Sequence, residues 1–115
     1  MHQLLETVRK LAEDNPTAVY EAPDEDGCYY TLGKCGPGSG CIIGQALLKD
    51  DPSLEETLND IDLEPVGAYH MFDQHLSMGL TQKETLWLVK VQERQDDKEC
   101  WADAIKIADE EVYGV

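Results

Sequence analysis

The chain has 115 residues, and its 9 Lys and Arg against 24 Asp and Glu give a formal net charge of −15. A chain of this length holds one modest core, so we expect a single globular domain over residues 1–115. The charge argues against direct binding to nucleic acid or to anionic lipid, because both contacts need clustered Lys and Arg. A hydrophobic fraction of 42% nevertheless favours folding over disorder.

The first segment predicts an amphipathic helix that ends at Asn15-Pro16, with one apolar stripe made of Leu4, Leu5, Val8, Leu11 and Ala12. Residues 17–22 and 28–32 are rich in Val, Tyr and Thr, which favour strands. The turn between them, residues 23–27, ends in Asp-Gly. This arrangement predicts a β-hairpin.

A glycine-rich loop is expected at residues 33–40, followed by a buried helix over 41–48. In this helix Gly44 would allow close approach of another backbone. The loop does not have the spacing of a dinucleotide-binding fingerprint, because Cys41 stands where a glycine is needed, counting from Gly36. It does not match a P-loop either, since Cys35 follows Gly33-Lys34 where Ser or Thr is required.

Four helix signals follow in the second half of the chain. Ser53 to Glu56 matches a capping box, and Glu64-Pro65 predicts the start of another helix that Gly79 interrupts. A second capping box, Thr81 to Glu84, precedes a strongly apolar helix, and a break near Asp96-Asp97 separates it from a final helix. The predicted fold class is therefore α+β, a mainly helical domain of four to six helices with one small β-hairpin.

Cysteine and histidine side chains offer weak candidates for a metal site, namely Cys28, Cys35, Cys41, His70 and His75. Their spacing differs from that of usual zinc knuckles, and two histidines five residues apart point about 140° from each other on a helix. We therefore expect buried thiols, no cofactor and no catalytic residue. An alternative stays open in which Cys41, placed at a helix start, is a nucleophile with His70 or His75 as its base.

The carboxylates gather at residues 21–26, 50–64 and 99–111. We interpret them first as solvated faces of the domain. The alternative interpretation is a surface that binds a basic partner or imitates DNA. The tryptophans lie on apolar stripes, although tryptophan also anchors protein interfaces. The candidate interaction residues are Trp87, Gln92, Asp96, Trp101, Asp24, Glu25 and Asp26.

The segment 41–47, CIIGQAL, and the later residues Gln92, Gln95-Asp96, Trp101 and Ala104-Ile105 resemble a group of small uncharacterised proteins from actinobacteria and their bacteriophages. The resemblance covers about two-thirds of the chain. It implies a phage-type source and a host-cell setting, and it carries no activity. This chain has Lys98-Glu99 where members of the group often have a glycine.

These observations favour a non-catalytic protein that binds and modulates a host protein. No signal peptide is predicted at Met1 to Glu6, and no apolar run approaches a membrane span, so we expect a location in the host cytoplasm. Two alternatives stay open. One is a DNA mimic that inhibits a nucleic-acid-binding host protein, and the other is a small zinc- or thiol-dependent protein that uses Cys41.

Overall fold

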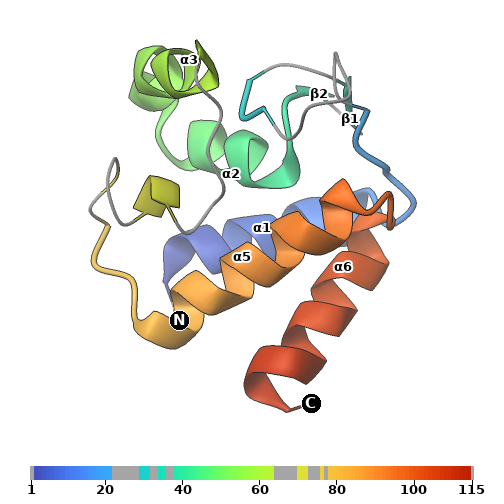
Figure 1. Ribbon diagram of the computed structural model, residues 1–115. Coiled ribbons are helices and arrows are strands. Elements are labelled where there is room, and N and C mark those ends of the chain that lie inside the picture. Colours follow the sequence, from blue (N-terminus) through green and yellow to red (C-terminus); the bar gives the residue numbers. More distant parts are fainter. Residues whose placement is uncertain are drawn as a thin grey trace.

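The computed structural model describes residues 2–21, 29–31, 34–35, 38–63, 70–72, 76 and 78–114, and helices dominate it (Figure 1). A short 3-10 turn, η1, precedes α3, and a π-helical turn, η3, continues α6. Two strands of two residues each pair with each other. The bounds are α1 Gln3–Asp14, β1 Lys34–Cys35, β2 Gly38–Ser39, α2 Ile42–Asp50, η1 Pro52–Leu54, α3 Glu55–Leu63, α5 Gln82–Asp96, α6 Trp101–Ala108 and η3 Asp109–Tyr113.

The core lies where four helices meet. Helices α5 and α6 form an antiparallel hairpin, α1 packs against α2 and α6, and α2 also touches α5. Helix α3 lies at the opposite end of the molecule from the C-terminal end of α6 (Figure 1). Fully buried large side chains fill the centre, among them Trp87, Trp101, Tyr20, Tyr30, Leu4, Leu5, Ile42, Ile43, Leu47, Leu58, Met71 and Leu88.

The first helix confirms the sequence prediction, because its whole apolar stripe is buried and it ends at Asp14. Its N-cap is His2, whose Nδ1 accepts a hydrogen bond from the Leu4 N–H at 3.0 Å. The His2 backbone N–H also donates to Glu84 Oε2 at 2.7 Å. The start of α1 is therefore tied to the start of α5.

The α5–α6 hairpin also follows the prediction. Thr81 and Glu84 form the reciprocal capping box, and α5 ends at Asp96, where a break was expected. Lys98 takes a left-handed conformation with φ 69°, and the Glu99 N–H donates to the Arg94 carbonyl at 3.1 Å. This is the Schellman arrangement, in which the left-handed position usually holds glycine.

The helix predicted at 41–48 is present as α2, Ile42–Asp50, and Gly44 does permit a close approach. A Cβ on Gly44 would lie 1.9 Å from the Tyr30 carbonyl oxygen, and one on Gly40 would lie 2.1 Å from the same atom. Real Cβ atoms do not come this close to a backbone oxygen, so both positions need glycine.

The capping box predicted at Ser53 is wrong. Asp51 is the N-cap instead, because its Oδ1 accepts from the Ser53 N–H at 3.1 Å while Pro52 takes the first position of η1. Helix α3 then begins at Glu55 as a continuation of that turn. Proline at N1 behind an aspartate cap is a strong start signal, and it outweighs the serine.

The predicted α+β fold class is wrong, since the protein is all-α. Within the described residues, 17–20 and 29–31 have no strand structure and Glu21 forms a single bridge, while the pair β1–β2 is too short to define a sheet domain. Side chains bind the backbone that a hairpin would pair. The Tyr29 N–H donates to the Tyr20 hydroxyl at 3.0 Å, and the Tyr30 N–H donates to Asp62 at 2.7 Å.

Part of the predicted helix after Glu64-Pro65 falls at residues 64–69, outside the described residues, as does the predicted hairpin turn at 23–27. Met71 and Phe72, expected on the apolar side of that helix, are buried. Gly79 has φ 69°, a left-handed conformation, just before the α5 cap. Among the described helices, none is both long and apolar enough to span a membrane.

Candidate functional site

The two tryptophans considered as interface anchors are core residues. Both are completely buried. Trp87 Nε1 donates to Asp109 Oδ1 at 2.8 Å, whereas Trp101 Nε1 is buried without a hydrogen-bond partner. Neither ring is exposed, so neither is available to contact another molecule without a rearrangement of the core.

The remaining interaction candidates divide between core and surface. Gln92 is buried, and its Nε2 donates to the Tyr30 hydroxyl at 3.1 Å, which joins α5 to the segment before β1. Asp96 is exposed and accepts from Gln95 Nε2 at 3.5 Å. Asp24, Glu25 and Asp26 lie outside the described residues. Asp96 is thus a surface residue, and Gln92 is a structural one.

The candidate metal ligands are not brought together in the part of the chain that the structure describes. Cys28 and His75 lie outside that part, and so does the side chain of Cys35. Cys41 is buried at the start of α2, and His70 is exposed. Within the described residues, no three His, Cys, Asp or Glu side chains form a group that could hold a metal ion.

Cys41 has a structural role that its sequence context did not reveal. It is the N-cap of α2, its Sγ accepts from the Gly44 N–H at 3.4 Å, and its own N–H donates to the Tyr29 carbonyl at 3.0 Å. The residue is fully buried. A thiol nucleophile needs access to its substrate, which this position does not offer.

Asp109 joins three elements in one polar cluster, which no local sequence pattern indicated. The Arg9 guanidinium, on α1, donates two hydrogen bonds to the Asp109 carboxylate at 2.8 and 2.5 Å. Arg9 also lies over the Trp87 ring, 4.8 Å from its centroid. Because Arg9 and Asp109 are 100 positions apart, no local motif links them.

The cluster perturbs the titration of its members. The hydrogen bonds from Arg9, with a further one from Trp87, lower the pKa of the Asp109 carboxyl against the opposing effect of burial. The same contact raises the pKa of Arg9. Both groups are therefore held in their charged forms. A permanently charged pair is suited to holding α1, α5 and η3 together and not to exchanging protons with a substrate.

Helix α3 carries the most distinctive exposed surface. Glu55, Glu56 and Asp60 are exposed on it, and Leu63 at its end has 81% of its surface accessible. By contrast, the other large exposed apolar side chains among the described residues, Val19 and Leu86, are near 40%. Within the described residues these carboxylates make no ion pair, so Leu63 and the three acids are free to contact another molecule.

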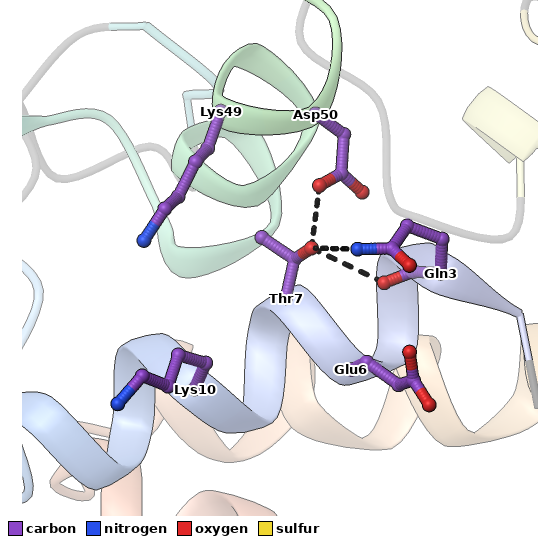
Figure 2. A pocket seen from close by; sticks show the side chains of 6 residues that line it. All are labelled: Gln3, Glu6, Thr7, Lys10, Lys49 and Asp50. Atoms are coloured by element: carbon purple, nitrogen blue, oxygen red, sulfur yellow. Dashed lines mark hydrogen bonds between the residues drawn. The ribbon is translucent and has the colours of Figure 1, made fainter.

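A separate polar pocket of about 380 Å³ lies between α1 and α2 (Figure 2). The Thr7 hydroxyl, at its floor, is 2.5 Å from Asp50 Oδ1 and 3.1 Å from the Gln3 carbonyl oxygen. The lining residues are Gln3, Glu6, Thr7, Lys10, Lys49 and Asp50. No sequence pattern predicts this pocket, because the residues of its two walls lie more than thirty positions apart.

No protein-family model, curated protein or solved structure matches this chain. Two surfaces of the described residues are candidates for function, the acidic and apolar end of α3 and the polar pocket between α1 and α2.

Proposed function

We propose that the protein acts without catalysis, by binding a partner protein that presents a basic surface with an apolar depression, and that α3 makes the contact. The partner would be a protein of the cell in which this chain is made, which the sequence resemblance implies is an actinobacterium. The observation that carries the proposal is Leu63, a leucine with 81% of its surface accessible on a helix whose neighbouring exposed residues are acidic.

Two physical contributions support this use of α3. Burying a leucine side chain against a partner stabilises a complex by about 1.5–3 kcal/mol. The exposed carboxylates of Glu55, Glu56 and Asp60, in a chain of net charge −15, would speed association with a basic protein and disfavour acidic competitors. The carboxylates would raise the association rate and favour basic partners, while Leu63 would be the apolar residue buried in the complex.

The test is affinity capture from an actinobacterial lysate with the tagged wild-type chain and two α3 variants. The variants are Leu63→Ser and a triple variant with Glu55→Gln, Glu56→Gln and Asp60→Asn. Their matched controls are Leu86→Ser and a triple variant that removes three other exposed carboxylates, Glu13→Gln, Asp103→Asn and Glu110→Gln. We expect one stoichiometric protein with the wild type and the controls, and its loss with both α3 variants.

Capture that is equal for α3 variants and controls would reject α3 as the contact, and the absence of any enriched protein would reject the proposal. A captured protein that binds DNA and is displaced by duplex DNA would identify the contact as an imitation of DNA. In that case the triple α3 variant should lose more binding than Leu63→Ser, and moderate salt should dissolve the complex.

A further inference from the structure

The pocket between α1 and α2 separates its charges. In Figure 2 the ammonium groups of Lys10 and Lys49 lie on one side of Thr7, and the carboxylate of Glu6 points to the other. The lining residues carry two positive and two negative side chains, with Asp50 as the second acid. The pocket is therefore neutral in sum and polarised along its length, within a strongly acidic chain.

Two of the four charges are used by the fold, because Lys10 pairs with Asp14 at 3.0 Å and Asp50 holds the Thr7 hydroxyl, and one charge on each side is left. Within the described residues, Lys49 and Glu6 make no hydrogen bond or ion pair. By comparison, Arg9, Lys90 and Arg94 are each ion-paired between elements. An unpaired ammonium and an unpaired carboxylate thus face one pocket without pairing with each other.

The floor of the pocket is fixed. Thr7 is 94% buried, and its hydroxyl is held between Asp50 and the backbone of α1. Gln3 Nε2 donates to the same hydroxyl at 3.5 Å. These contacts join α1 to the end of α2 and hold the backbone of both walls in place, whereas a ligand would order the exposed side chains of Lys49 and Glu6.

We propose that this pocket binds a small zwitterion of the ω-amino acid or dipeptide class. The ligand carboxylate would pair with Lys49, and its ammonium would pair with Glu6. The volume of about 380 Å³ is within the range of small-molecule sites, about 300–1,000 Å³. A singly charged ligand would satisfy one side only and leave the other charge unpaired. This inference is independent of the contact proposed for α3.

The experiment is a titration of the isotope-labelled protein, followed by its amide NMR chemical shifts. The probes are glycine, β-alanine, γ-aminobutyrate and ε-aminocaproate, in which the distance between ammonium and carboxylate increases. Hexanoate and hexylamine are the singly charged references. We expect shifts confined to the pocket residues, one chain length that binds best, and binding about tenfold weaker for the references.

Substitutions then assign the two sides. Lys49→Gln and Glu6→Gln should each weaken the best probe about three- to tenfold, whereas Lys106→Gln and Glu110→Gln, which make the same charge changes on exposed residues of α6 and η3, should leave it unchanged. Pocket shifts that are absent for every probe up to about 10 mM would overturn the proposal. Equal binding of the singly charged references would overturn it as well.

Discussion

The cluster of Arg9, Asp109 and Trp87 predicts a pH-dependent loss of stability in Asp109→Asn. The substitution keeps an oxygen that can accept from Trp87 Nε1–H, but it removes the charge that pairs with Arg9. Arg9 and Asp109 are partly buried, with 27% and 20% of their side-chain surfaces exposed. We therefore expect the loss to come from the ion pair and not from a cavity.

The magnitude follows from the two hydrogen bonds that Arg9 donates, at 2.8 and 2.5 Å. Hydrogen bonds to charged groups contribute about 1.5–3 kcal/mol when they are buried, and exposed ion pairs contribute less than about 1 kcal/mol. A partly buried, bidentate pair falls between these limits. We expect Asp109→Asn to lower the free energy of unfolding by about 1–2 kcal/mol at neutral pH. Asp109→Ala should cost more, because it also leaves the buried Trp87 N–H without an acceptor.

The pH dependence has a definite sign. Hydrogen bonding from Arg9 lowers the pKa of Asp109 in the folded protein. A carboxyl with a lowered folded pKa contributes stability above its unfolded pKa, about 3.9, and that contribution disappears as the pH falls through the folded value. The difference between wild type and Asp109→Asn should therefore be full near pH 6–7. It should shrink below about pH 4.

Urea unfolding followed by circular dichroism across this pH range measures the effect. Glu110→Gln is the control, since it removes a neighbouring exposed carboxylate from η3 and relieves the same net charge. It should change the free energy of unfolding by less than about 0.5 kcal/mol. Equal effects of the two substitutions, or a difference that grows as the pH falls, would refute the role assigned to the Arg9 contact.

Two backbone positions give further predictions. Lys98 has φ 69°, so Lys98→Gly should be about 1 kcal/mol more stable than Lys98→Ala in urea unfolding. Both variants lose the side-chain contact with the Tyr20 carbonyl, and only alanine keeps the left-handed strain. Equal stabilities of the two variants would contradict this. Gly44→Ala should destabilise the protein by several kcal/mol, since the new Cβ would lie 1.9 Å from the Tyr30 oxygen. Helix propensity alone would stabilise Gly44→Ala by about 1 kcal/mol and raise the thermal midpoint. A raised midpoint would therefore show that Gly44 and the Tyr30 carbonyl are not in close contact.

Local signals were enough to predict most helices. The apolar stripe of α1 and the Thr81 capping box act within one or two turns, so the residues that specify them are neighbours in the sequence. The break after Asp96 was also predictable, because a continuous helix would have placed charged residues on the buried stripe. Lys98 takes the left-handed position that follows this break.

The prediction of an α+β fold was wrong because contacts between distant residues, which a local sequence pattern does not show, decide the structure here. Tyr20 and Tyr30 have high strand propensity, but both are core residues that lie outside any strand. Asp62 accepts from the N–H groups of Tyr30 and Thr31, and so takes the place of a partner strand. Such contacts join residues more than thirty positions apart, and propensity has no information about them.

Polar side chains that make contacts within the fold can be separated from those that are available for function. Asp62 holds the Tyr30 segment, Gln95 accepts from the Ile42 N–H at 2.7 Å, and Asp109 holds Arg9 and Trp87. These side chains already bind a backbone N–H or a charged partner. Substituting them should therefore lower the stability of the fold and should not act on binding directly. Among the described residues, the exposed carboxylates of Glu55, Glu56 and Asp60 on α3, and the charges of Lys49 and Glu6 in the pocket, make no such contact. Variants of Leu63, Lys49 and Glu6 should therefore separate function from folding, because their side chains can change while the core contacts remain.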